Sequence, residues 1–313
     1  AAGVQPLAGI APQGGARVPF TVVTLTAGND GDVTVNGFNV ERTGPADDAV
    51  FSGIVLLNSQ GIQIGIDKTF NSDHRLTVGD PVVIPKGTSK TYTIAGNMAS
   101  SLSSFAGQVA LLSLVGVNTT ATVTGPLPIT GAAQTINASL VIGTAQATTS
   151  SFDPDTSLTK EIGTTGVRFA GIRLQAGSAE KIRLYSIRWN QTGSVGSGDL
   201  ANLVTIVDGT SYPMEISSDG KYYTAIFGSG ISMDKGFSKD VYVQGDIVGS
   251  SSSGRTVQFD IYKATDIYIA GETFGFGITV TAGEATAAVS TSSEFTTGTP
   301  FFSGSVTNVS AGS

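Results

Sequence analysis

The chain has 313 residues, of which 13% are charged, none is cysteine and one is histidine. The missing cysteine excludes disulfides, thiolate metal sites and cysteine nucleophiles, and a single histidine provides too few ligands for an ordinary zinc site. The formal net charge is −7 at pH 7 and no basic run exceeds two residues, so we expect no nucleic-acid partner. No stretch approaches the roughly 18 consecutive apolar residues of a membrane helix, and we expect no membrane insertion.

Residues 1–17 are expected to form an extended N-terminal arm. Two prolines and four glycines within this stretch disfavour a helix. Val4, Leu7 and Ile10 are nevertheless apolar and need cover. Two interpretations stay open: a frayed terminus, or an arm that lies on its own domain or on a neighbouring molecule.

Residues 18–142 are predicted to form a β-sandwich of short strands. The first strand, 18–26, is rich in β-branched and aromatic side chains, which favour extended structure. In the next strand the apolar positions alternate and then slip in phase, at Val33, Val35, Phe38 and Val40. Such a slip is typical of a β-bulge, where one extra residue is inserted into a strand.

Residues 167–290 repeat this pattern. Lys86-Gly-Thr-Ser-Lys90 returns as Lys235-Gly-Phe-Ser-Lys239, 149 residues later, and the phase slip returns at the same spacing. A period this long is too large for a solenoid unit and indicates two copies of one domain. With seven or more short strands per copy, the predicted fold class is all-β, with two tandem antiparallel β-sandwich (Ig-like) domains of the same fold.

Two further segments complete the predicted domain organisation. Residues 143–166 are polar and are expected to form a linker between the domains. Residues 291–313 are expected to form a C-terminal tail strand, because 300–310 have strand character but no obvious partner in either repeat. The apolar residues of this tail are therefore predicted to contact another molecule; they are Phe301, Phe302 and Val306.

Reactive side chains are too few to indicate an enzyme. A Ser-His-Asp triad would have to use His74, which lies in a predicted hairpin turn where an exposed histidine is expected. Carboxylate pairs such as Asp47-Asp48 lie in loops, where turn geometry alone favours Asp. We therefore expect no catalytic activity and no catalytic residues.

Calcium is the one cofactor that the loops could hold. Ca²⁺ takes roughly six to eight oxygen ligands, and carboxylates cluster at Asp30 and Asp32 and again at Asp153 and Asp155. Neither cluster has the spacing of an EF-hand, and ordinary Asx turns explain the same residues. No other cofactor is expected.

Aromatic side chains leave a glycan as a candidate ligand. Trp189 is the only tryptophan, and because it corresponds to Val40 of the first copy it is expected in the core. The better candidates for exposed rings are Tyr222, Tyr223, Tyr262 and Tyr268.

The second half of each copy carries a shared motif, in which an apolar residue, a Lys-Gly turn and a strand are followed by Gly and a polar residue. It reads Ile84-Pro-Lys-Gly-Thr-Ser-Lys-Thr-Tyr-Thr-Ile-Ala-Gly-Asn97 and Met233-Asp-Lys-Gly-Phe-Ser-Lys-Asp-Val-Tyr-Val-Gln-Gly-Asp246. This pattern, over about a tenth of the chain, resembles bacterial surface-layer and adhesin-like secreted proteins built of tandem β-sandwich repeats. The resemblance implies a secreted protein and brings no catalytic residues with it.

Together these features favour a self-assembling extracellular structural protein, such as a filament, sheath or surface-layer subunit, whose partner is itself. The terminal segments would join subunits by covering a sheet edge of a neighbour, in an open-ended head-to-tail contact. Few Lys and Glu and many Thr, Ser and Gly favour secretion to the cell surface. The alternatives are a monomeric cell-surface adhesin that binds glycan or protein, and a viral tail or capsid protein.

Overall fold

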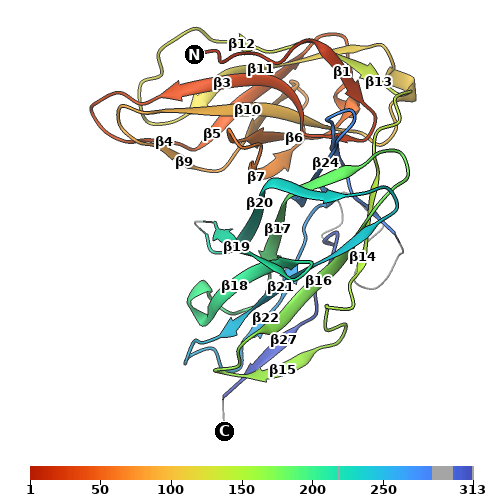
Figure 1. Cartoon of the computed structure of the whole chain (residues 1–313). Coiled ribbons are helices and arrows are strands. Elements are labelled where there is room, and N and C mark those ends of the chain that lie inside the picture. The colour runs from red at the N-terminus through yellow and green to blue at the C-terminus, as the bar shows by residue number, and fades with distance from the viewer. Residues whose placement is uncertain (218, 284–298, 312–313) are drawn as a thin grey trace. The chain divides into compact units, whose positions relative to one another are not determined.

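The computed structural model describes residues 1–217, 219–283 and 299–311 (Figure 1). Within these residues the protein is all-β, and the helical segments are four single 3-10 turns: Asp48–Val50, Ser103–Phe105, Ser197–Asp199 and Ala264–Asp266. The chain divides into two compact units, Ala1–Val141 and Ile142–Ser313, which we call unit 1 and unit 2. The predicted all-β fold class is confirmed.

Unit 1 is a sandwich of two sheets. The first contains, in order, β3 (Val18–Thr26), β10 (Ser89–Met98), β6 (Phe51–Leu57) and β7 (Gln63–Lys68). The second contains, in order, β1 (Gly9–Pro12), β13 (Gln134–Asn137), β11 (Val109–Asn118), β5 (Gly37–Thr43) and β8 (Arg75–Val78). Four short elements complete the unit: β2 (Gly15–Ala16), β12 (Ile129–Thr130) on β11, and β4 (Val33–Val35) paired with β9 (Val82–Ile84). Apolar side chains of alternating strand positions fill the core, among them Phe20, Phe38 and Ile94.

Unit 2 is one long, curved run of strands. The order is β25 (Gly277–Ile278), β24 (Ile267–Gly271), β17 (Ile182–Gln191), β20 (Tyr222–Met233), β19 (Thr210–Ile216), β18 (Leu200–Val207), β21 (Ser238–Ile247), β16 (Val167–Ala176), β14 (Ala145–Thr149) and β26 (Thr281–Ala282). β19 pairs with both β18 and β20 and therefore makes the run of strands continuous. β23 (Phe259–Asp260) pairs with β17, and a separate sheet contains β15 (Leu158–Glu161), β27 (Thr307–Ser310) and β22 (Thr256–Val257).

The central strand pairs of the two units have the same register. β10 pairs with β3 so that Ser89 lies opposite Thr26, and β21 pairs with β16 so that Ser238 lies opposite Gln175. Both ladders contain a bulge at the corresponding residue, since the register skips Phe20 in one and Phe169 in the other. The 149-residue sequence repeat is therefore also a repeat of backbone irregularities, which are preserved within families of related folds.

The predicted phase slip also corresponds to an irregularity in the backbone. In unit 2 the register of β17 shifts between Leu184 and Ser186, as a bulge requires. In unit 1 the slip is a break between β4 and β5 at Asn36, whose N–H donates to the carbonyl of Asn118 at 2.7 Å. Apolar residues fall on odd positions before the irregularity and on even positions after it, or the reverse, and the irregularity lets both sets face the same core.

The segment predicted as a linker belongs to unit 2. The boundary between the units falls after Val141, and within residues 143–166 β14 pairs with β16, placing Ala145 opposite Ala176. The polar composition is misleading because Gln146 and Thr148 occupy the outward positions of β14, while Ala145 and Ala147 are buried.

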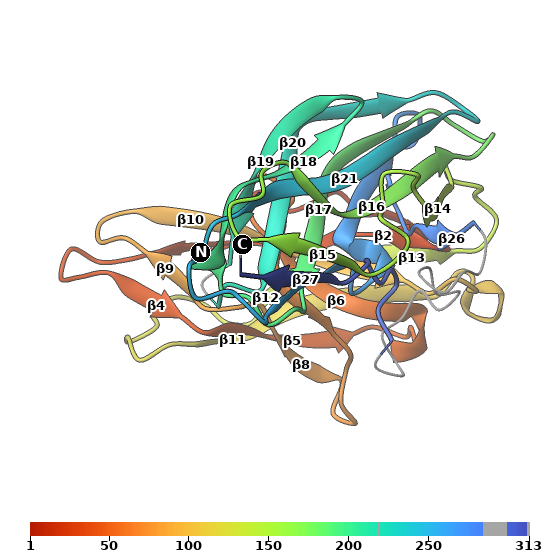
Figure 2. The same ribbon diagram turned by 90° about the horizontal axis from the view of Figure 1, so that it is seen from below.

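The prediction that the C-terminal tail contacts another molecule is wrong for its described residues, 299–311; residues 291–298 lie outside the described part of the chain. Phe301 and Phe302 are 1% and 0% exposed and belong to the core of unit 2. Val306 is half-buried, and its carbonyl accepts from the N–H of Leu158 at 2.9 Å. β27 lies between β15 and β22 (Figure 1), and Figure 2 shows it beside β15, so the tail is a strand of its own unit.

Candidate functional sites

The N-terminal arm lies along the free edge of β3 in its own unit. Its N-terminal amine donates to the carbonyl of Thr24 at 2.8 Å, and Gly3 N–H donates to the carbonyl of Val22 at 3.1 Å. The side chain of Gln5 makes two bonds to the same strand, accepting from Val22 N–H at 2.9 Å and donating to Val22 O at 2.6 Å. The arm thus satisfies the backbone groups that a sheet edge would otherwise leave open.

The apolar side chains of the arm stay in solvent. Val4 is 94% exposed, Leu7 is 89% exposed and Ile10 is 37% exposed, although β1 pairs with β13 in parallel and Gln134 Nε2 donates to the carbonyl of Leu7 at 3.1 Å. Of the two interpretations, the arm on its own domain is the one the structure shows. Exposed apolar groups that follow one extended segment are characteristic of interaction surfaces.

A hollow of mixed polarity adjoins the first residue of the arm. Its volume is about 910 Å³, and apolar residues such as Leu25, Val33 and Val117 line it together with Asp30, Asp32 and several threonines. Unit 1 therefore carries an exposed apolar segment and a partly apolar recess, both of which include residues of the arm.

The candidate calcium ligands are not gathered with a third acidic or histidine side chain among the described residues. Asp30 and Asp32 border the hollow of unit 1, and Asp32 Oδ1 accepts from Lys86 N–H at 2.9 Å. In that part of the chain which the structure describes, no three His, Asp or Glu side chains are grouped to hold an ion.

Asp153 serves as a structural acceptor. It is 7% exposed, and its Oδ1 accepts from Asp155 N–H at 2.9 Å and from the Ser305 hydroxyl at 2.7 Å. Its Oδ2 accepts from Gly171 N–H at 2.9 Å. The carboxylate thereby holds residue 305 of the tail and β16 together.

The single histidine belongs to an ion-pair cluster. His74 Nδ1 lies 2.7 Å from Asp48 Oδ2 and 3.0 Å from Arg42 Nη2. Since one nitrogen cannot donate to the carboxylate and accept from the guanidinium at once, we assign its proton to the shorter contact, with Asp48. Arg42 is 8% exposed and also contacts Asp48 and the carbonyl of Ala46. The contacts of His74 with Arg42 and Asp48 thus hold the turn before β8 against β5.

The cluster makes the stability of unit 1 depend on pH. Burial acts to raise the pKa of Asp48, but hydrogen bonds from His74 and Arg42, together with the charge of Arg42, outweigh it and hold this pKa below its ordinary value of 3.8. The stabilisation is therefore fully present above about pH 3.8 and is lost as the pH falls through the lower folded-state pKa.

We expect Asp48→Asn to lower the free energy of unfolding of unit 1 by about 1–3 kcal/mol at pH 7, because Arg42 loses its charged partner while still buried. The difference from the wild-type protein should shrink below pH 3.8. Denaturant unfolding at a series of pH values measures it. Asp73→Asn, in an exposed position of the same turn, is the control and should leave the stability unchanged. Equal stability of D48N and wild type at pH 7 would contradict the assignment.

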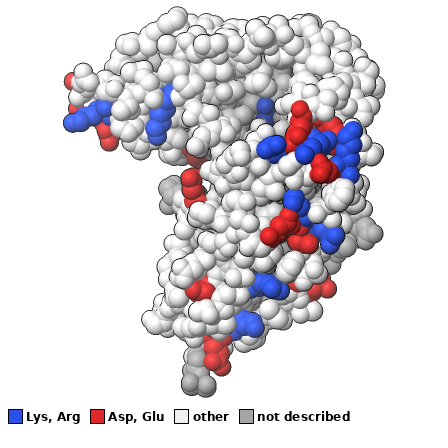
Figure 3. All heavy atoms as spheres, in the orientation of Figure 1, with Lys and Arg blue, Asp and Glu red and all other residues white. Residues whose placement is uncertain are grey.

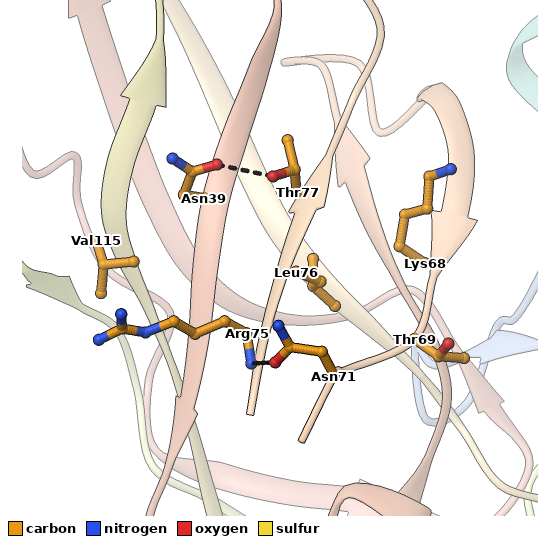
Figure 4. Close-up of a pocket in the computed structure, with 8 residues that line it drawn as sticks. All are labelled: Asn39, Lys68, Thr69, Asn71, Arg75, Leu76, Thr77 and Val115. Atoms are coloured by element: carbon orange, nitrogen blue, oxygen red, sulfur yellow. Dashed lines mark hydrogen bonds between the residues drawn. The ribbon is translucent and has the colours of Figure 1, made fainter. Parts of the chain in front are cut away.

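The outward face of β5 and β8 forms a polar groove of about 710 Å³ (Figure 4). Asn39 and Thr77 lie opposite each other, and the Thr77 hydroxyl donates to Asn39 Oδ1 at 2.8 Å. Arg75 N–H donates to Asn71 Oδ1 at 2.9 Å and fixes the turn that enters β8. Among the described residues that line this groove are amides, hydroxyls and two cations, which suit hydrogen bonding to a ligand better than covalent chemistry.

The aromatic residues divide between core and surface. Trp189 is fully buried and its indole N–H donates to the Thr205 hydroxyl at 3.1 Å, so its predicted place in the core is confirmed. Tyr223 is also fully buried, which makes its predicted exposure wrong. Tyr222 and Tyr262 are half-buried on one face of unit 2.

Charged side chains are few and mixed in sign. Figure 3 shows one face of the molecule, on which most atoms belong to uncharged residues and acidic and basic groups lie intermixed. Several form exposed pairs, such as Arg183 with Glu272 at 2.8 Å and Lys181 with Asp234 at 3.1 Å. No helix among the described residues has the length and apolar character needed to cross a membrane.

Comparison with known proteins leaves the family open. No family model and no curated protein matches the chain. Among solved structures, it is similar to the calcium-binding domain CBD12 of CALX1.1, with 9% identity, a TM-score of 0.23, and coverage of 81% of this chain and 78% of that chain. It is also similar to the C-terminal domain of the Streptococcus pyogenes antigen I/II-family protein AspA, with 8% identity, a TM-score of 0.22, and coverage of 86% and 93%. TM-scores this low carry no functional argument.

Proposed function

We propose that the protein is a non-enzymatic structural subunit of an extracellular surface, which self-associates through its N-terminal arm. The observation that supports this most directly is the exposure of Val4 and Leu7, 94% and 89%, on a segment whose backbone is held in place by β3. A fixed backbone with unpacked apolar side chains loses little conformational entropy when a partner covers it.

The partner is a second copy of the chain. Each copy carries an apolar arm and, beside Ala1, a hollow of about 910 Å³ whose lining includes the apolar Leu25, Val33 and Val117. The arm of one copy enters the hollow of the next copy, in a head-to-tail contact. The resulting dimer therefore keeps a free arm at one end and a free hollow at the other. Growth then continues into a filament.

Two features support the non-enzymatic part of the proposal. The single histidine is engaged with Asp48 and Arg42, and the described residues group no metal ligands. The extracellular location is supported by the composition, with no cysteine, few charges and abundant Gly.

The test is the double variant Val4→Ser, Leu7→Ser. Because both side chains are exposed, folding should be unaffected, while the loss of apolar contact should weaken self-association at least tenfold in sedimentation velocity over a concentration series. The control is Ile66→Ser, Val83→Ser, which removes two apolar side chains of unit 1 that are 39% and 47% exposed outside the arm. Electron microscopy shows whether the assemblies are filaments.

Two outcomes would contradict the proposal. One is a wild-type protein that stays monomeric at every concentration. The other is an arm variant that assembles as the control does.

A further inference from the structure

A second polar recess lies on the face of unit 2 where β17 passes between β20 and β23. Asn190 on β17 lies directly opposite Tyr222 on β20 and directly opposite Asp260 on β23. Residues directly opposite each other in antiparallel strands point to the same face of a sheet. Asn190 is therefore the centre of a row with an aromatic ring on one side and a carboxylate on the other.

Two loops flank this row of residues and line the same hollow. One is the segment 192–197 that follows β17, and the other is the turn 219–221 that precedes β20. They approach closely at Gly220, where an added Cβ would lie 4.0 Å from Ser197 Cβ. The hollow is partly open to solvent and has a volume of about 610 Å³, and Lys221 and Tyr262 also line it.

The ring of Tyr222 is held by its neighbours. The guanidinium carbon of Arg188 lies 5.0 Å from the ring centroid, within the range of a cation–π contact. Arg188 is fixed in turn by Asp266, whose Oδ1 accepts from Arg188 Nε at 3.0 Å. A ring positioned in this way presents a preformed apolar surface to a ligand.

Hydrogen-bonding groups of the hollow are also preformed. The Thr192 hydroxyl donates to Asp260 Oδ2 at 2.7 Å, which orients both groups. Gln191 lines the hollow, is 8% exposed, and its Nε2 is buried without a hydrogen-bond partner among the described atoms. A buried donor without an acceptor is costly.

We propose that this hollow binds a neutral saccharide. The C–H face of a pyranose ring packs on an aromatic ring such as Tyr222, while its hydroxyls pair with amides and carboxylates such as Asn190 and Asp219. The lining carries one carboxylate, Asp219, and one ammonium, Lys221, so its charges balance and favour a neutral ligand over an ion. An added peptide strand is disfavoured because β17 is already paired on both sides here.

The corresponding place in unit 1 has a different chemistry. Glu41 occupies the position equivalent to Asn190, 149 residues earlier, and Arg75 lies opposite it as Tyr222 lies opposite Asn190. Glu41 and Arg75 form an ion pair at 3.0 Å. The groove of Figure 4 therefore lacks the aromatic ring in this position, and the saccharide site belongs to unit 2 alone.

The experiment applies the full chain to an array of neutral oligosaccharides and measures the strongest binder by titration calorimetry. We expect saturable binding, which Tyr222→Ala and Asn190→Ala each weaken at least tenfold and Tyr222→Phe retains. The control is Tyr268→Ala, because Tyr268 stacks on Tyr185 at 5.2 Å outside this hollow. Thermal unfolding of each variant confirms that it is folded.

The arm variant Val4→Ser, Leu7→Ser should bind the same saccharide as the wild-type protein, since its substitutions lie in unit 1. Absence of binding to every neutral oligosaccharide on the array would overturn the proposal. So would binding that persists unchanged in folded Tyr222→Ala and Asn190→Ala proteins.

Discussion

Deletion of residues 299–313 is expected to unfold unit 2 and to leave unit 1 folded. The deletion removes Phe301 and Phe302, which are 1% and 0% exposed, and the ring of Phe302 packs edge-on against Trp189 with centroids 6.4 Å apart. Each Phe→Ala change in a core costs about 3–5 kcal/mol. Because the total stability of a domain is about 5–15 kcal/mol, the loss of both rings and of β27 removes most of it.

Differential scanning calorimetry of the full chain and the truncated chain measures this effect. The point variants Phe301→Ala and Phe302→Ala should each lower the unfolding temperature of unit 2. The control is Phe237→Ala, because this ring is 67% exposed and its loss should change the stability by less than about 0.5 kcal/mol. A truncated chain in which unit 2 still unfolds cooperatively at the wild-type temperature would show that the tail is no part of the core.

Glu180→Ala is expected to have the second largest effect. This side chain is 2% exposed, and its carboxylate accepts from Gly143 N–H at 2.6 Å, Thr273 N–H at 2.8 Å and Phe274 N–H at 3.2 Å. Gly271 is required beside it, because an added Cβ would lie 2.2 Å from Glu180 Oε1. One carboxylate therefore ties the start of unit 2 to the turn after β24.

Each backbone donor left unsatisfied costs about 1–3 kcal/mol, so we expect the variant to lose about 3 kcal/mol or more. In a domain of this size, such a loss lowers the unfolding temperature by roughly 6–12 °C. Circular dichroism of thermal unfolding measures it, with the exposed Glu215→Ala as the control. If both variants melt together, the three hydrogen bonds have no net stabilising role.

Local patterns were sufficient to predict the strands and the duplication. The equivalence of Phe20 with Phe169 follows from the printed letters, and both residues occupy the same bulge. Alternation of apolar residues predicts strands because side chains of a strand point to opposite faces in turn. These signals act between near neighbours in the chain and can be read without knowing which strands pair.

Long-range pairing could not be predicted in the same way. The sequence alone predicts contacts of Phe301 and Phe302 with another molecule, because β15, the strand partner of the tail, lies about 150 residues earlier and pairs in parallel. The burial of Glu180 cannot be recognised from the sequence, because its letters do not distinguish it from an acidic residue on the surface. The three N–H groups that bind its carboxylate come together only in the folded structure.

The candidate sites were predicted only in part. The arm was found from its apolar residues, and Tyr222 was noted as a ring that could contact a ligand. The row that it forms with Asn190 depends on the register of β17 and β20, which the sequence does not encode locally. The contact of His74 with Asp48 likewise joins residues 26 positions apart.

The position of β27 has a mechanical consequence. Residues Thr307–Ser310 are bonded on one side to β15 in parallel and on the other to β22. The backbone hydrogen bonds of a sheet run across its strands. A force along the axis of β27 therefore acts on all of its hydrogen bonds at once, in shear, and does not break them one after another. In the filament that we propose, unit 2 would therefore resist extension under tension until the whole strand slides.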